Sequence, residues 1–157
     1  MIRRAPITKE QALQKLKQYC AYQERCHSEV SRKLYDLGIW KKEQDELIAQ
    51  LIEGDYLNEE RFAIAYAGGK WRAKQWGRNR ILMELKQRKI SAYCIKKAMK
   101  EIGEEEYRTV LEKLAKKKYE SLKGEQWLMR KKKTVDYLLQ RGFEPNLIQE
   151  LLPVKTK

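Results

Sequence analysis

The apolar positions of this chain recur at steps of three and four residues, and strict alternation of apolar and polar residues is absent. Steps of three and four place side chains on one face of a helix, whereas alternation is typical of a strand. Leu, Lys, Glu, Gln, Arg and Ala dominate, and these residues lose little side-chain freedom in a helix. The pattern therefore predicts an all-α protein.

Helix start and stop signals divide the first third of the chain into three segments. Thr8 and Gln11 have the spacing of a capping box, which marks a helix start. Glycine accepts left-handed backbone without strain, so Gly38 is expected to end the second helix, and the third is expected to end at Gly54. The three predicted helices run from Thr8 to about Tyr22, from Ser28-Glu29 to Gly38, and from about Lys41 to Gly54.

The same order of signals then appears twice more. Asn58 and Ser91 are helix caps, and the run Glu104-Glu105-Glu106 favours the positive end of a further helix. Pro145 suits the first turn of a helix, and Pro153 ends the series. In the second round the predicted helices lie over 58–77, from about Arg78 to Lys89-Ile90, and over 91–103. In the third round one helix begins at 104, a second ends at Gly142, and the last lies over 145–152.

An internal repeat underlies these three rounds. The segments 34–39, 85–90 and 138–143 read LYDLGI, LKQRKI and LLQRGF, and their starts are 51 and 53 residues apart. Such self-similarity predicts an elongated, curved tandem array of three three-helix repeats, each packed partly on its neighbours. The expected divisions are an N-terminal arm over 1–7, repeats over 8–57, 58–103 and 104–153, and a C-terminal tail over 154–157.

Charge changes this picture from a fold to a candidate function. The 157 residues include 35 Lys and Arg against 22 Asp and Glu, a formal charge of +13, which favours a polyanionic partner such as nucleic acid. Residues 58–102 hold 12 basic and 4 acidic side chains, whereas residues 1–57 hold 10 and 9 and residues 103–157 hold 13 and 9. No apolar run is long enough for a membrane span, so no membrane partner is expected.

Cationic side chains of the middle repeat are expected to converge on one surface. On a helical wheel, Lys70 and Lys74 flank one side of the apolar stripe of its first helix, and Arg61 and Arg72 flank the other. The stripe comprises Phe62, Tyr66, Gly69 and Ala73. The candidate partner-binding and nucleic-acid-binding residues are Arg61, Lys70, Arg72, Lys74, Trp76, Arg78, Arg80, Lys86, Arg88, Lys131 and Lys132.

These residues also have a purely structural interpretation. A single helical lysine is more often solvated than bound, but the charge asymmetry and the later run over 130–133 favour binding for the set. Trp71 and Trp76 are candidates for stacking on a base or anchoring a partner, and burial against a neighbouring repeat is as plausible for Trp71. Gly68-Gly69 suits the close approach of two helices.

Catalytic chemistry has little support in the sequence. Cys20, Cys26 and Cys94 cannot all pair and lack metal-knuckle spacing, so free thiols in a reducing, cytoplasmic compartment are expected. His27 follows Cys26, but adjacent residues at a helix start point apart and no third group orients them. Without a P-loop, a nucleophile elbow or a metal-ligand cluster, we expect no enzyme activity, cofactor or metal.

Two segments of the middle repeat resemble the signature of the RecX family of regulatory proteins. They are 55–63, which reads DYLNEERFA, with Tyr66, and 76–81, which reads WGRNRI, with Glu84-Leu85. The resemblance extends upstream to Arg25, Ser28, Glu29, Val30, Lys33, Leu34 and Gly38, and the three-unit layout spans about residues 8–152. Proteins of that family consist of three tandem three-helix repeats, which agrees with the internal repeat.

The resemblance implies a non-enzymatic negative modulator of the RecA recombinase. Such a protein lies in the helical groove of the RecA–DNA filament, hinders ATP hydrolysis and strand exchange, and limits filament extension. The implied partners are the RecA nucleoprotein filament and, weakly and without sequence preference, single-stranded and double-stranded DNA. The protein is expected to act as a monomer.

Two rival interpretations do not depend on the resemblance. A general DNA-binding protein of helix-turn-helix type also pairs short helices around glycine turns, and it binds one duplex sequence far better than others. A modulator instead shows weak, salt-dependent DNA binding that strengthens when the recombinase is present. A helical scaffold whose charge only aids solubility predicts no retention on polyanions at about 0.15 M salt.

Overall fold

The computed structural model describes residues 7–152, and every regular element in that range is an α-helix. The helices are α1 (Lys9–Tyr22), α2 (His27–Asp36), α3 (Lys41–Glu53), α4 (Glu59–Lys74), α5 (Arg78–Gln87), α6 (Ala92–Met99), α7 (Glu104–Ser121), α8 (Trp127–Gln140) and α9 (Pro145–Leu151). The capping box of Thr8 and Gln11 opens α1, and the side chains of Asn58 and Ser91 cap α4 and α6 as predicted. Apart from Ile7, the expected arm and tail lie outside the described residues, as does the stop at Pro153.

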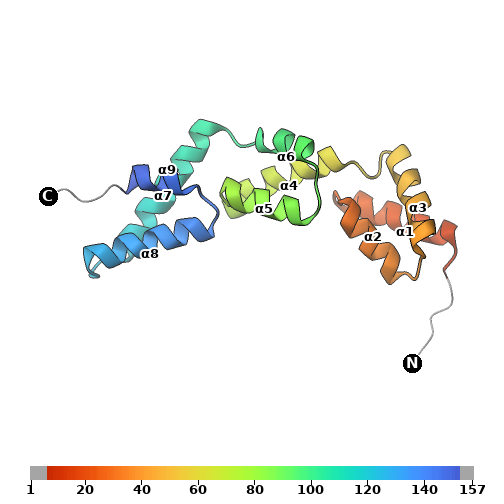
Figure 1. Ribbon diagram of the computed structural model, residues 1–157, viewed down its shortest axis with the longest axis horizontal. Helices are drawn as coiled ribbons and strands as arrows, with labels where there is room; N and C mark the ends of the chain where they lie inside the picture. Colours follow the sequence, from red (N-terminus) through yellow and green to blue (C-terminus); the bar gives the residue numbers. More distant parts are fainter. Residues whose placement is uncertain (1–6, 153–157) are drawn as a thin grey trace, which may run out of the picture.

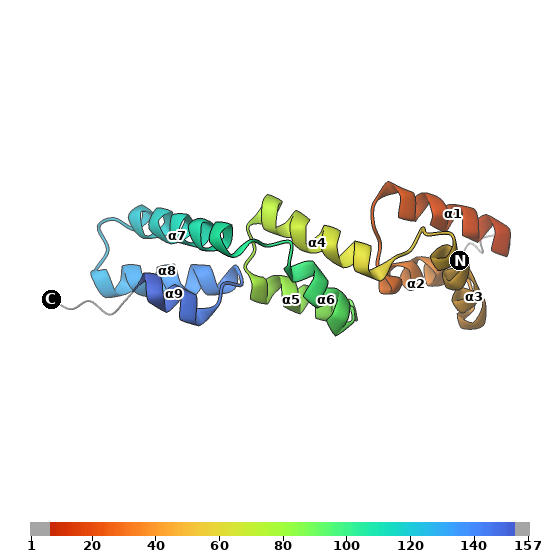
Figure 2. The same ribbon diagram turned by 90° about the horizontal axis from the view of Figure 1, so that it is seen from above.

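The helices form three groups that follow one another along a line (Figures 1 and 2). We name them unit 1 (α1–α3), unit 2 (α4–α6) and unit 3 (α7–α9). Unit 2 lies between the other two, and each helix packs mainly on helices of its own unit. The predicted all-α array of three-helix repeats is therefore confirmed.

The internal repeat corresponds to one turn that is built three times. Near the end of the second helix of each unit, a leucine is fully buried, and its carbonyl accepts a hydrogen bond from the amide five residues later at 3.0–3.1 Å. The residue before that amide has a positive φ, which is the backbone expected at such a helix end. The three residues are Gly38 (81°), Lys89 (60°) and Gly142 (99°).

The buried face of α4 differs from the predicted stripe. Gly68 and Trp71 are buried, whereas Gly69 and Ala73 are not. The reason is that α4 packs on α6 and also reaches unit 3, so two neighbours determine its buried side. The helix also ends before Gly77, at Lys74, because Gln75 adopts left-handed backbone (φ 54°) and Gly77 becomes the N-cap of α5.

Units 2 and 3 share one apolar core. The rings of Trp71 and Phe143 each lie 5.2 Å from the ring of the fully buried Tyr107, measured between centroids. The Tyr107 hydroxyl accepts a hydrogen bond from the Arg78 amide at 2.9 Å and donates one to Glu144. Burial raises the pKa of this hydroxyl, and the bond to Glu144 raises it further. A neutral tyrosine thus ties together the starts of α5, α7 and α9.

The backbones of these two units also touch. The Gly77 amide donates to the Arg141 carbonyl at 2.7 Å, and the Asn79 amide donates to the Gly142 carbonyl at 2.9 Å. A β-carbon on Gly77 would lie 2.3 Å from backbone atoms of Gly142 and Phe143, closer than any side chain tolerates. The φ of Gly77 is −73°, which any residue can adopt. Glycine is therefore required at this position by the close approach of the two backbones and not by its own conformation.

A different contact joins units 1 and 2. Arg61 on α4 donates from Nε to Glu24 at 2.7 Å and from Nη1 to Asp55 at 3.1 Å. Cys26, at the start of α2, is buried in the core that units 2 and 3 share. Cys20, Cys26 and Cys94 are free thiols, as predicted, and all three are buried.

Candidate nucleic-acid interface

One aromatic ring of unit 2 carries two cations. Trp76 lies in the link between α4 and α5, with Lys70 in the last turns of α4 and Arg80 in the first turn of α5. The Lys70 ammonium lies 5.2 Å from the Trp76 ring centre, and the Arg80 guanidinium lies 4.1 Å from it. The same ammonium lies 5.4 Å from the ring centre of Tyr66. We name Tyr66, Lys70, Trp76 and Arg80 the Trp76 cluster.

The rings of this cluster position its charges. Each cation–π contact contributes about 0.5–1 kcal/mol at an exposed site, which offsets part of the repulsion between two like charges. Tyr66 and Trp76 are partly buried against the shared core, so neither ring is free to swing away. Burial also raises the pKa of Tyr66, which keeps its hydroxyl neutral beside the cations. Lys70 and Arg80 are therefore held near each other.

The cluster borders a groove between α5 and the end of α8. Three hollows of about 280, 490 and 510 Å³ adjoin one another, because neighbouring hollows share lining residues such as Arg80 and Met83. The first two are lined by residues of both α5 and α8, and the third continues along α5 alone. We name this surface the α5–α8 groove. Its lining residues are Lys74, Trp76, Asn79, Arg80, Leu82, Met83, Glu84, Lys86, Gln87, Tyr137, Leu139, Gln140, Arg141 and Gly142.

The cations of the groove have no acidic partner in the described part of the chain. Within residues 7–152, Lys74, Arg80 and Lys86 form no ion pair, and the same holds for Lys70 beside the groove. The lining acid Glu84 is already paired with Arg88 at 2.9 Å. Uncompensated positive charge that lines a hollow attracts phosphate and carboxylate groups. The groove can therefore bind anions through charged hydrogen-bond donors.

Arg141 adds a cation that the sequence prediction missed. Its Nη1 donates to the Lys74 carbonyl at 2.6 Å, and its Nε donates to the Tyr137 hydroxyl at 2.9 Å, so it is fixed without using an acid. The repeat alignment pairs Arg141 with Arg88, a predicted binding residue. This correspondence in the repeat is the sequence signal from which Arg141 could have been predicted as a binding residue.

Three of the predicted binding residues do not offer free charge. Arg61 bridges units 1 and 2, and Arg88 pairs with an acid one turn earlier on α5. Arg78 pairs with Glu104 at 2.9 Å and Glu144 at 3.0 Å, and its guanidinium lies over the Tyr107 ring. Burial lowers the pKa of Arg78, but its bonds to the two carboxylates outweigh burial and leave that pKa raised. Sequence spacing does not show which acid each arginine reaches.

Three other predicted residues lie away from the groove. The Arg72 guanidinium lies over Gly68, where a β-carbon would come within 2.8 Å of Nη1, so the atoms nearest to this position belong to an arginine side chain. On α8, Lys131 lies 5.5 Å from the Trp127 ring centre and Lys132 pairs with Asp136 at 3.0 Å. None of the three lines the groove.

The two tryptophans considered as ligand contacts differ in position. Trp71 is 3% exposed and packs at a tilt against Tyr107 of unit 3, so burial against a neighbouring repeat is the correct alternative for it. Trp76 lines the groove. The structure thus leaves Trp76 at the candidate interface as a residue that positions cations.

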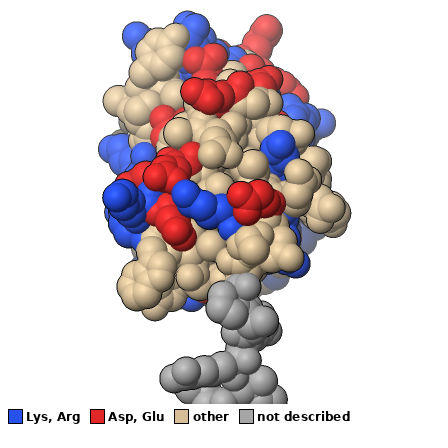
Figure 3. All heavy atoms as spheres, turned by 90° about the vertical axis from the view of Figure 1, so that its right-hand side faces the viewer, with Lys and Arg blue, Asp and Glu red and all other residues tan. Residues whose placement is uncertain are grey.

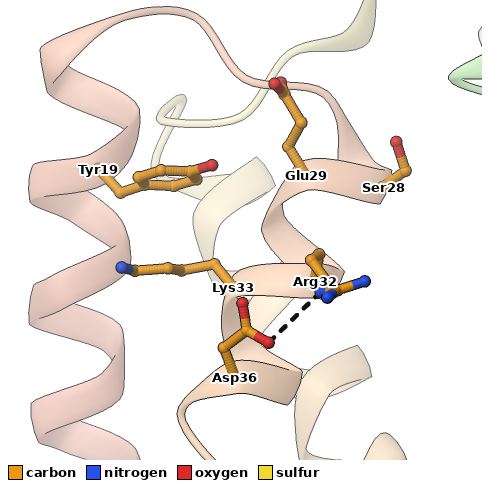
Figure 4. A pocket seen from close by; sticks show the side chains of 6 residues that line it. All are labelled: Tyr19, Ser28, Glu29, Arg32, Lys33 and Asp36. Atoms are coloured by element: carbon orange, nitrogen blue, oxygen red, sulfur yellow. Dashed lines mark ion pairs between the residues drawn. The ribbon is translucent and has the colours of Figure 1, made fainter.

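Unit 1 carries mixed charge. Seen from its end of the array, basic and acidic side chains are interspersed (Figure 3). A hollow of about 260 Å³ between α1 and α2 contains Tyr19, Ser28, Glu29, Arg32, Lys33 and Asp36 (Figure 4). Arg32 pairs with Asp36 at 3.3 Å, and Glu29 and Lys33 line the same hollow. Acids thus balance bases there, and the hollow has no charge surplus for a polyanion.

Metal binding, membrane insertion and thiol chemistry find no support in the described part of the chain. No group of three or more His, Cys, Asp or Glu side chains within residues 7–152 is arranged to hold a metal ion. No helix in that range combines the length and the apolar character that crossing a membrane requires. Burial raises the pKa of the Cys20, Cys26 and Cys94 thiols, which makes them poor nucleophiles.

Known families match two of the three units. Residues 58–99 match the family model described as the second three-helix domain of RecX, and residues 104–152 match its third three-helix domain. These matches cover unit 2 and unit 3, which supply both walls of the α5–α8 groove.

Curated relatives and solved structures agree with the family models. The chain is 32% identical over 115 residues to the regulatory protein RecX of Leuconostoc mesenteroides and 27% identical over 131 residues to that of Bacillus cytotoxicus. These alignments cover 73% and 83% of this chain but 43% and 48% of the relatives, so the chain spans less than half of their length.

Two crystal structures share the fold. One is of a regulatory protein RecX (TM-score 0.84, 19% identity), and it aligns over 93% of this chain and 73% of the other. The second is of RecX from Lactobacillus salivarius (TM-score 0.80, 23% identity), and it aligns over 93% and 97%. At these identities the likeness establishes the fold.

Proposed function

Because the chain belongs to the RecX family of regulatory proteins, we propose that it is a negative modulator of the RecA recombinase. In this proposal the protein lies in the groove of the RecA–DNA filament and slows ATP hydrolysis, strand exchange and filament extension. The observation that carries the proposal is the α5–α8 groove, where cations without acidic partners surround the Trp76 cluster.

The shape of the molecule supports this mode of binding. A filament repeats the same subunit along its axis, and an elongated array can contact more than one subunit at once (Figure 2). Weak contacts made along one rod act at high effective concentration, so together they bind more tightly than each does alone. One molecule contains the whole groove, so the proposal requires no second copy.

The chemistry of the groove supports a sequence-indifferent ligand. Lysine and arginine that contact phosphates fix the position of a protein on nucleic acid without reading bases. We assign the contact to Lys70, Lys74, Arg80, Lys86 and Arg141. Arg72, Lys131 and Lys132 stay as predicted contacts outside the groove. In this scheme repeat 58–103 supplies the Trp76 cluster and repeat 104–153 supplies the facing wall.

The test is a titration of RecA ATP hydrolysis on single-stranded DNA. The wild-type protein is expected to lower the turnover, and a variant with Lys70→Gln, Lys74→Gln and Arg80→Gln is expected to need at least about tenfold more protein for half-inhibition. Removing three charged interactions of about 0.5–1 kcal/mol each accounts for that factor.

A matched control removes the same charge elsewhere. Lys113, Lys116 and Lys117 are exposed on α7 and form no ion pair within residues 7–152, so changing all three to Gln also lowers the net charge by three. This control is expected to inhibit nearly as well as the wild type, with equal helicity by circular dichroism. Unchanged RecA turnover at saturating wild-type protein would refute the proposed function, and equal weakening of both variants would refute the site.

A further inference from the structure

Helix α6 presents a second cationic surface on unit 2. Its Cys94, Ile95 and Ala98 pack into the core, whereas Tyr93, Lys96, Lys97 and Lys100 follow the spacing i, i+3, i+4 and i+7, which defines one helix face. Tyr93 is 62% exposed, and the Lys97 ammonium lies 5.5 Å from its ring centre. We name Lys89, Tyr93, Lys96, Lys97 and Lys100 the α6 face.

Within residues 7–152 the acids nearest to α6 are on its core side, where the Cys94 thiol donates to Glu59 of α4 at 3.5 Å and Glu60 lies close by. From Leu85 to Lys100 the chain has six basic residues and no acidic one. The lysines of the α6 face form no ion pair within residues 7–152, although Glu101 follows in the sequence. A contiguous set of unpaired lysines beside an exposed ring is a surface suited to a polyanion.

The other two units show that the fold does not need these lysines. The repeat alignment places Asp45 and Glu46 of unit 1, and Gln149 and Glu150 of unit 3, at the positions of Lys96 and Lys97. There the acids serve their own units, because Glu46 pairs with Lys9 at 2.6 Å and Glu150 pairs with Arg108 at 3.2 Å. Unit 2 alone has two cations at these positions.

Lys89 extends the same cationic surface beyond the start of α6. It has a φ of 60°, at the turn where units 1 and 3 have Gly38 and Gly142. A residue with a β-carbon is strained in left-handed backbone, and glycine is the residue that relieves the strain. Unit 2 therefore has an exposed lysine in left-handed backbone three residues before α6, where the other two units have glycine; within residues 7–152, Asp55 and Gln75 also adopt such backbone.

The α6 face is separate from the Trp76 cluster. In Figure 1, α6 runs along the upper edge of unit 2 and α5 along the lower edge. No residue of the α6 face lines the α5–α8 groove. We propose that the α6 face binds the phosphate backbone of a second nucleic-acid strand, so that unit 2 holds two strands at once.

A nucleic-acid strand fits this surface better than an acidic protein does. Lysines are depleted in the cores of protein interfaces, which rest on buried aromatic and apolar anchors. The α6 face has one exposed ring among four flexible point charges, which is the composition of a surface that follows a phosphate backbone. The proposal rests on the proposed function for the identity of the first ligand, the strand bound at the groove.

The test measures whether one protein molecule bridges two strands. Two oligothymidylates of about ten nucleotides carry a donor and an acceptor fluorophore, and energy transfer between them is followed as protein is added. Lys96→Asp with Lys97→Glu places the residues of unit 1 at these two positions, and circular dichroism checks that the variant keeps the wild-type helicity. The wild type is expected to bind two strands and to bring them together, whereas this variant binds one strand and loses at least about nine-tenths of the transfer.

A second variant separates binding from folding. Lys89→Gly is expected to raise the melting temperature, because it removes the left-handed lysine, and to lower bridging at the same time. The groove variant with Lys70→Gln, Lys74→Gln and Arg80→Gln is expected to keep one strand, on the α6 face, and to lose bridging as well. The salt dependence of the second binding step is expected to weaken in the α6 variants by about 0.7 in log–log slope for each phosphate that is no longer neutralised.

Two results would overturn the proposal. The first is a wild-type protein that binds only one strand. The second is an α6 variant that still bridges two strands, and if that variant also no longer binds RecA, the partner of the α6 face is a protein. Failure of the proposed function looks different. If the α6 variants lose bridging but the wild type leaves RecA turnover unchanged, the RecA proposal is refuted and the second site is supported. If the α6 variants still bridge but the wild type lowers RecA turnover, the second site alone is refuted.

Discussion

Gly77→Ala tests how the two walls of the α5–α8 groove are joined. The added β-carbon would lie 2.3 Å from the carbonyl carbon of Gly142 and the nitrogen of Phe143, and 2.4 Å from the oxygen of Gly142. All three are backbone atoms, so no side chain can rotate to relieve the clash. Unit 3 must shift as a body, which breaks the Gly77–Arg141 and Asn79–Gly142 hydrogen bonds.

The expected effect is about 3–5 kcal/mol in the free energy of unfolding. Two backbone hydrogen bonds contribute about 1 kcal/mol each, and an overpacked contact contributes about 1–3 kcal/mol more. Gly103 supplies a matched control, because it is also a helix N-cap with φ near −70° but has open space around its Cα. Gly103→Ala is expected to change stability by less than about 1 kcal/mol.

Urea unfolding followed by circular dichroism measures both variants against the wild type. Equal stability of Gly77→Ala and Gly103→Ala would refute the view that units 2 and 3 are in direct backbone contact. The predicted outcome is a large loss for Gly77→Ala alone, together with weaker RecA inhibition, because the groove walls separate.

Further predictions concern the shared core and the thiols. Tyr107→Phe is expected to lose about 1–3 kcal/mol, because the Arg78 amide and Glu144 each lose a partner. The raised pKa of Tyr107 means that its stabilising effect is present below about pH 10 and is lost as the pH rises above it, so unfolding from pH 8 to 11 should show an alkaline decline that Tyr107→Phe reduces. Arg78→Lys is expected to lower the melting temperature, because lysine cannot hold both Glu104 and Glu144 in a fork. A thiol reagent at pH 8 is expected to label Cys20, Cys26 and Cys94 only as the protein unfolds, and rapid labelling of the native protein would contradict their burial.

The fold was predictable because its signals are local and repeated. The turn after Leu34 recurs after Leu85 and Leu138 with the same hydrogen bond, and the caps Thr8, Asn58 and Ser91 act on amides three residues away. Such features depend on short stretches of sequence. Lys89 has no glycine to mark the turn, yet it adopts left-handed backbone at the position that alignment with Gly38 and Gly142 predicts.

The candidate interface was predictable only in part, because its residues differ in long-range partners. Lys70 and Arg78 look alike in the sequence, yet Lys70 stays unpaired over Trp76 whereas Arg78 meets Glu144, 66 residues away. The buried side of α4 depends in the same way on unit 3, which a helical wheel does not contain. Charge counts therefore located unit 2, and only tertiary contacts separated binding cations from structural ones.

Photo-crosslinking from the groove tests the central claim most directly. A photoreactive residue in place of Gln140, which is exposed and lines the groove, is compared with the same residue in place of Gln50, which is exposed on α3 of unit 1. With RecA filaments on single-stranded DNA, position 140 is expected to crosslink to RecA or DNA in higher yield than position 50. Crosslinks from position 50 alone would contradict the account.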